Sequence, residues 1–448
     1  MEENKMASAP IKKLVLTTGI PLMISLLISN LYNFVDSIFV AHISEKALTA
    51  LSLANPIQVL MSALGMANAV GLNAAISKAL GKKDQKEVEQ TATSAIWLAF
   101  IFWLILVILS IFILKPYFLS QSNHNLEITN YGISYLRICM LASLGVMGQW
   151  VFDRFTISSG KTHLFLITLS SGAIVNIILD PIFIFGYFGL PQMGIAGAAI
   201  ATIIGQFVGA TMGIIINKKY NKEIPIHFSL IPNFKCVKNI LSVGVPSGIA
   251  QAMLSMMGIY VNSILIDFSS TAVAVNGVLV KIQSLILVPI WGLNNGLVPL
   301  VAYNYGSHQL KRSFGSLKWS LIYEYGIFII LLILLELFPS KILYLFDASK
   351  HMLQMGVPAM RILGFAYLIS IVSLALSSTF QGFSKGLQAM ILTLSRQVIL
   401  LFIFLTLFKS FNQINLIWFA YILAEVCCLP IGYMMYKKIK KKVTEEIS

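Results

Sequence analysis

Residues 96–114 form an apolar stretch, IWLAFIFWLILVILSIFIL, that carries no charge. A helix of about 20 such residues crosses the hydrocarbon core of a bilayer. Inside that core, a single segment satisfies its backbone hydrogen bonds only as a helix. Charged residues make up 11% of the 448 residues, against roughly 25% in soluble domains. The chain is therefore predicted to be an all-α membrane protein.

The sequence contains twelve apolar runs of this kind. The first is not a signal peptide, since it has no small-residue cleavage site and keeps Asp36 in its outer part. The six histidines and four cysteines show no metal-ligand spacing, so we expect neither an enzyme nor a cofactor. The runs predict transmembrane helices at residues 14–41, 48–78, 92–114, 128–157, 163–187, 194–217, 239–267, 272–304, 314–337, 352–381, 388–408 and 415–436.

Basic residues set the expected orientation of these helices, because cytoplasmic loops are enriched in Lys and Arg. With both termini in the cytoplasm, most of the 32 basic residues fall on the cytoplasmic side, including the stretch from Lys218 to Lys238 and the tail from Lys437 to Lys442. The net charge of +14 then reflects topology and attraction to the headgroups of the lipid bilayer. A nucleic-acid partner would need a soluble basic domain, and none is predicted.

The chain contains an internal repeat at a separation of about 225 residues. TGIP (18–21) recurs as VGVP (243–246), and VDSIFV (35–40) recurs as VNSILI (261–266). Each half holds six predicted helices, so both halves insert with the same orientation, an arrangement that transporters use with a ligand site between the halves. The predicted domains are an N-terminal six-helix lobe at 1–217, a cytoplasmic linker at 218–238, and a C-terminal six-helix lobe with a basic tail at 239–448.

Residues 175–185, VNIILDPIFIF, place an amide and a carboxylate in an apolar run. Ionisable residues inside membrane helices are rare and by default mark function. Asp36 and Asp180 both lie roughly 8–10 Å below the outer boundary, and Asn176 lies one turn below Asp180. Loss of water and a second nearby carboxylate both favour a protonated acid, and Pro181 removes a helical hydrogen bond and favours a bend. We expect Asp36, Asn176 and Asp180 to bind the coupling ion, H⁺ or Na⁺, with helix packing as the alternative role.

Other polar side chains within the spans are candidates for a substrate cleft or for gating. Arg396 and Glu425 lie at similar depths and are expected to form a buried pair, for which structure is favoured over function. Lys281 should face a cleft or pair with an acid, and its role stays open. Asp153 either forms a gate or marks the end of its helix. The remaining candidates are Glu324, Asn33, Gln283, Asn294, Asn295 and Met256.

Four segments carry a family resemblance: NLYNFVDSIFV (30–40), KALGKKDQKEVE (78–89), VNIILDPIFIFG (175–186) and GLNNGLVPLVAYNYG (292–306). Together they resemble the multidrug and toxic compound extrusion (MATE) family, in its bacterial MepA-like branch. The resemblance covers the whole chain, and the segments are specific to the family in combination.

The resemblance implies a V-shaped antiporter, monomeric in the bacterial plasma membrane, that exports small amphipathic cations such as drugs or metabolites in exchange for H⁺ or, as the second choice, Na⁺, by alternating access. Family ion-site positions match Asp36, Asn176 and Asp180, and Asp153 stands where a Glu is frequent. Asn262, the repeat mate of Asp36, is uncharged, which disfavours coupling through the second lobe. The alternatives are a lipid-linked glycan or lipid flippase of the same wider superfamily and a non-transporting receptor.

Overall fold

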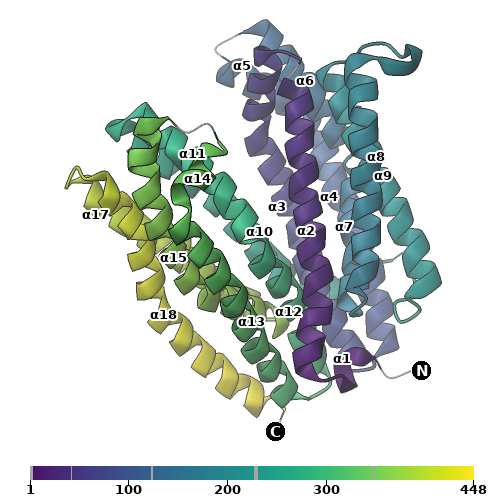
Figure 1. Ribbon diagram of the computed structural model, residues 1–448. Helices are drawn as coiled ribbons and strands as arrows, with labels where there is room; N and C mark the ends of the chain where they lie inside the picture. Colours follow the sequence, from purple (N-terminus) through teal and green to yellow (C-terminus); the bar gives the residue numbers. More distant parts are fainter. Residues whose placement is uncertain (1–3, 42, 123–124, 227–230, 347–348, 448) are drawn as a thin grey trace. The chain divides into compact units, whose positions relative to one another are not determined.

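The computed structural model describes residues 4–41, 43–122, 125–226, 231–346 and 349–447, and in these ranges the regular structure is helical. The elements are α1 (Lys5–Ser8), α2 (Ile11–Ala41), α3 (Glu45–Gly81), α4 (Gln85–Phe112), α5 (Leu114–Gln121), α6 (Leu126–Leu141), α7 (Leu144–Ser158), α8 (Thr162–Phe185), η1 (Tyr187–Gly189), α9 (Ile195–Tyr220), α10 (Phe234–Phe268), α11 (Ser270–Ile286), α12 (Val288–Gly306), α13 (Leu310–Leu337), α14 (Pro339–Tyr344), α15 (Lys350–Gly382), α16 (Gly386–Leu394), η2 (Ser395–Leu400), α17 (Leu401–Lys409) and α18 (Ile414–Glu445) (Figure 1).

Ten of the described helices are long and apolar enough to cross a membrane. Two further spans are broken pairs, in which α6 and α7 meet at 46° and α11 and α12 meet at 49°. Counting each pair as one span gives twelve, so the predicted fold class and number of spans are confirmed.

The two breaks correct the prediction of continuous helices at 128–157 and 272–304. In the first, Ser143 Oγ donates to the carbonyl of Met140 and competes with the backbone bonding of the helix. In the second, Pro289 lies in the first turn of α12 and has no amide hydrogen to donate to α11. A hydropathy pattern does not register either break, because both helices of each pair are apolar.

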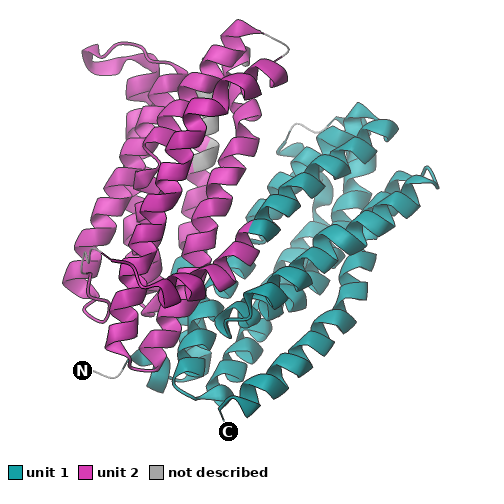
Figure 2. Ribbon diagram, turned by 180° about the vertical axis from the view of Figure 1, so that it is seen from behind, with its two compact units in different colours: residues 1–23, 249–448 teal, residues 24–248 magenta. Residues whose placement is uncertain are grey.

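The described chain divides into two compact units (Figure 2). Unit 1 comprises residues 1–23 and 249–448, and unit 2 comprises residues 24–248. This division differs from the predicted domains, which met at the linker 218–238. The two boundaries lie inside α2 and α10, about 225 residues apart, and therefore at equivalent positions of the internal repeat.

Close contacts at glycines explain why α2 and α10 each belong to both units. A Cβ atom on Gly19 would lie 2.5 Å from a methyl carbon of Leu293, so the first turns of α2 pack tightly on α12 in unit 1. A Cβ atom on Gly244 would lie 1.5 Å from the carbonyl oxygen of Ala67, so the first turns of α10 pack directly on α3 in unit 2. Small residues allow this backbone approach in membrane helices.

Candidate ion-coupling site

The site is built on the tight pairing of α8 with α9, which run side by side in unit 2 (Figure 1). A Cβ atom on Gly205 of α9 would lie 2.7 Å from the carbonyl oxygen of Gly172 on α8 and 3.0 Å from Cβ of Asn176. Two glycines therefore bring the helix backbones close enough for the side chain of Asn176 to be enclosed between them.

Asn176 and Asp180 are neighbours on the buried face of α8, where their exposed fractions are 2% and 0%. Asn176 Nδ2 donates to Asp180 Oδ1 over 3.3 Å and also approaches Thr202 Oγ1 of α9 at 3.4 Å. The amide thus orients the carboxylate from one helical turn away, as the spacing of the two residues predicts. The helix continues through Pro181 to Phe185.

Asp36 comes to this place from α2 and is near enough to Asp180 for the two carboxylates to interact electrostatically. One turn further along each helix, the rings of Phe39 and Phe185 meet edge to face with centroids 6.3 Å apart. This aromatic contact packs on the buried side chain of Ile184 and holds α2 and α8 at one level. The structure thus places the two acids on neighbouring helices of unit 2, and their joint role in ion binding stays a prediction.

Three oxygen atoms in this cluster are buried and, within the described part of the chain, accept no hydrogen bond: Asp36 Oδ1, Asn176 Oδ1 and Asp180 Oδ2. An unpartnered buried acceptor costs free energy, and a buried carboxylate costs more unless a charge compensates it. A proton shared by the acids would supply a donor and remove one negative charge. A Na⁺ ion would satisfy all three oxygens, since carboxylate and amide oxygens suit hard cations.

Asp153 has a structural partner in unit 2 rather than a place at a helix end. It is 3% exposed and accepts a hydrogen bond of 2.5 Å from Thr168 Oγ1 of α8. Helix α7 continues beyond it to Ser158, so the hypothesis that Asp153 ends its helix is wrong. Its role as a gate stays a prediction.

In unit 1, the predicted pairing of Arg396 with Glu425 is confirmed. Arg396 lies in the π-helical segment η2 and its guanidinium donates to Glu425 Oε1 of α18. The two side chains are 4% and 9% exposed. Asn262, the repeat mate of Asp36, has a neutral partner, because Asn276 Nδ2 donates to Asn262 Oδ1 over 2.9 Å.

Of the remaining candidates, the structure brings Asn294 of α12 and Glu324 of α13 together, and the others that it describes are dispersed along α10 to α12. Lys281 and Met256 are exposed, and Gln283 is half-buried. Asn294 and Asn295 each donate to a carbonyl one turn earlier in α12. Glu324 is fully buried in α13. The side chain of Asn33 lies outside the described part of the structure.

The family assignment follows from a comparison of the chain with models of known families. The MatE model matches residues 21–182 and again residues 246–407. The chain belongs to the MATE family. The second match starts about 225 residues after the first, which confirms the internal repeat, and the protein is thereby a multi-pass membrane transporter.

Known MATE proteins match this chain over most of its length. The multidrug export protein MepA of Staphylococcus aureus (strain MRSA252) is 23% identical over 437 residues, which cover 96% of this chain and 94% of MepA. The probable multidrug resistance protein NorM of Thermotoga maritima is 26% identical over 393 residues, covering 86% and 82%. A solved outward-facing multidrug resistance MATE transporter has the same fold, with a TM-score of 0.93, 22% identity and 99% coverage of both chains.

Sequence reasoning missed two polar neighbours of the candidate ion site. Thr202 approaches Asn176, and Tyr135 of α6 interacts with Asp36 while accepting a hydrogen bond of 3.2 Å from Gln58 Nε2. The available signal for Thr202 was a lone hydroxyl in the small-residue run AGAAIATIIG. A lone hydroxyl does not indicate which helix it faces, so only the packing of α9 on α8 shows that Thr202 lies next to Asn176.

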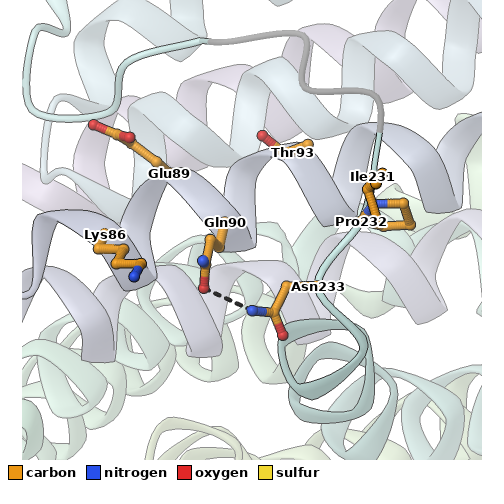
Figure 3. A pocket seen from close by; sticks show the side chains of 7 residues that line it. All are labelled: Lys86, Glu89, Gln90, Thr93, Ile231, Pro232 and Asn233. Atoms are coloured by element: carbon orange, nitrogen blue, oxygen red, sulfur yellow. Dashed lines mark hydrogen bonds between the residues drawn. The ribbon is translucent and has the colours of Figure 1, made fainter.

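A separate hollow of about 440 Å³ lies where the segment before α10 crosses α4 (Figure 3). Asn233 Nδ2 donates to Gln90 Oε1 over 2.7 Å at its edge and fastens the end of the linker to α4. The lining residues include none of the predicted site residues, so the hollow belongs to the docking of the linker. They are Lys86, Glu89, Gln90, Thr93, Ile231, Pro232 and Asn233.

Proposed function

We propose that this MATE protein is a secondary antiporter of a bacterial plasma membrane, with both termini in the cytoplasm. It exports amphipathic cationic compounds, drugs or metabolites, by alternating access, and the coupling ion is H⁺, with Na⁺ as the alternative. The printed names of the relatives, multidrug export and multidrug resistance proteins, support this class of substrate. No further cofactor is needed, because the ion gradient supplies the energy.

The observation that carries the proposal is the electrostatic interaction of Asp36 with Asp180, which Asn176 orients, together with one buried unpartnered oxygen on each of the three side chains. Two acids that lose water together favour a shared proton, and they release it when water reaches them again. Protonation removes the repulsion between the two carboxylates, so α2 and α8 prefer different spacings in the two states. Pro181 gives α8 a point where such a change of shape is cheap.

The test uses purified protein in vesicles with an imposed ion gradient. Asp36→Asn and Asp180→Asn should each abolish gradient-driven efflux of a fluorescent cation, because an amide cannot gain or lose the proton. The matched control is Asp267→Asn, which changes an exposed acid paired with Lys409 at the end of α10. Transport at the unsubstituted rate in both site variants would refute the assignment.

The coupling ion is identified by supplying one gradient at a time. A pH gradient without Na⁺ should drive efflux, and a Na⁺ gradient at uniform pH should not. The opposite result would assign Na⁺ to the same three oxygens.

The flippase alternative has one observation in its favour, the exposed cation Lys281 on α11. A lipid-linked pyrophosphate would need such a positive group. Thermal stabilisation of the protein by a lipid-linked sugar, lost in Lys281→Gln and absent for cationic dyes, would favour that function over drug export.

A further inference from the structure

Glu324 is a further buried acid, located in unit 1 and outside the ion cluster of unit 2. It lies in the middle of α13 with 0% of its surface exposed. Its apolar surroundings are the fully buried Phe328, one turn further along α13, and Ile290 of α12, both members of one core cluster. A charged carboxylate at such a place is costly unless a cation pairs with it.

The polar contacts of Glu324 in the described structure are neutral. Ser320 Oγ, one turn earlier, donates to Glu324 Oε1 over 2.7 Å. The side chain of Asn294, from α12, interacts with the same carboxyl group. Neither neighbour brings the positive charge that Arg396 brings to Glu425 elsewhere in unit 1.

Two oxygen atoms of this group, Glu324 Oε2 and Asn294 Oδ1, are buried and accept no hydrogen bond from the described residues. The amide of Asn294 donates one hydrogen to the carbonyl of Ile290 over 2.9 Å and has a second hydrogen for the carboxyl group. Glu324 Oε2 and Asn294 Oδ1 still lack a donor among the described residues. A proton on Glu324 supplies that donor and at the same time removes the uncompensated charge.

The elements around Glu324 carry few groups that could titrate in its place. Tyr325 is its chain neighbour and interacts with it, and Tyr367 of α15 packs on the same apolar cluster. At the start of α2, Lys12 lies over the ring of Trp319, 5.3 Å from its centroid, and Tyr323 donates to the Lys12 carbonyl. None of these neighbours carries a carboxyl group, so among the groups named here Glu324 is the acid that would bind the proton.

We propose that Glu324, Ser320 and Asn294 form a proton-binding site in unit 1, separate from the ion cluster of unit 2. The site binds H⁺ when α12 and α13 are closed around it and releases it when water reaches the carboxyl group. A metal cation is a poorer occupant, because these three residues offer it a single negative charge, whereas Asp36 and Asp180 offer two in unit 2. Proton binding by Glu324 does not require antiport, so the experiment below tests it separately from the proposed function.

The experiment measures carboxyl protonation directly, by infrared spectroscopy of the full-length protein in lipid across a pH series. The background is Asp36→Asn with Asp180→Asn, which removes the two acids of the ion cluster in unit 2. Adding Glu324→Gln should remove a titrating component equivalent to one protonated carboxyl group. The matched control Glu336→Gln alters an acid of the same helix that is paired with Arg361, and it should retain that component.

Ser320→Ala gives a second readout that keeps the carboxyl group. Loss of the hydroxyl donor to the charged form should shift the titration of this component to higher pH without removing it. Spectra of the Glu324→Gln and background proteins that agree at every pH would overturn the proposal. A component that stays protonated over the whole range in which the protein is folded would also overturn it, since Glu324 would then be a structural acid.

Discussion

The buried pair of Arg396 and Glu425 provides a quantitative test of how unit 1 is stabilised. Only 4% and 9% of the two side chains are exposed, and the pair joins η2 to α18. Glu425→Gln leaves the guanidinium without a counter-charge, and Arg396→Gln leaves the carboxylate alone. Breaking a buried pair from one side typically costs about 3–5 kcal/mol, so each variant should lose that much free energy of unfolding.

The double variant separates loss of the pair from loss of packing. Replacing both residues by apolar side chains of similar volume is frequently neutral or stabilising, so Arg396→Met with Glu425→Leu should recover most of the loss. The assay is reversible unfolding in mixed detergent micelles for the two single variants and the double variant. The three differences in unfolding free energy from the unsubstituted protein show whether an apolar pair recovers what either single variant loses.

The exposed pair of Lys409 and Asp267 is the matched control. Its side chains are 48% and 53% exposed, and Lys409 Nζ lies 2.7 Å from Asp267 Oδ2. Exposed pairs contribute about 0–1 kcal/mol, so Asp267→Asn should fall within that range. If Glu425→Gln lost less than about 1 kcal/mol of unfolding free energy, as the control does, the argument that burial makes breaking this pair costly would be refuted.

Two further predictions concern helix packing and pH. Gly205→Ala should push α9 away from Gly172, reduce gradient-driven transport and cost about 1–3 kcal/mol of unfolding free energy, whereas Gly258→Ala, with open space around it, should be neutral in the same assays. Burial acts to raise the pKa of Glu446, but hydrogen bonds from Tyr305 and Lys385 lower that pKa overall. These bonds attach the C-terminal end of α18 to the rest of unit 1. The attachment is therefore present at neutral pH and is lost as pH falls through the lowered pKa of Glu446. Protection of the amides at residues 440–447, relative to their intrinsic exchange rate at each pH, should fall at acid pH, and a Glu446→Gln protein with the same pH response would contradict the assignment.

Much of the candidate site could be predicted because hydropathy and helical geometry act along the chain. The depth of Asp36 in α2 matches that of Asp180 in α8, and the four-residue spacing of Asn176 and Asp180 places both on one face. The pairing of Arg396 with Glu425 followed from equal depth in the same way. The partner of Asp153 could not be predicted, because Thr168 comes from another helix and depth does not choose between neighbours.

The sequence by itself determined the number of spans, the repeat and the family, because a bilayer requires long apolar helices and the repeated motifs lie at fixed offsets. The tertiary structure alone decided which helices touch. Contacts at Gly19 and Gly244 place the first turns of α2 and α10 with the opposite half of the chain, and the approach of Gly172 to Gly205 brings Thr202 to Asn176. The physical reason is that hydropathy sets depth in a membrane, whereas lateral neighbours are chosen by close packing of small residues.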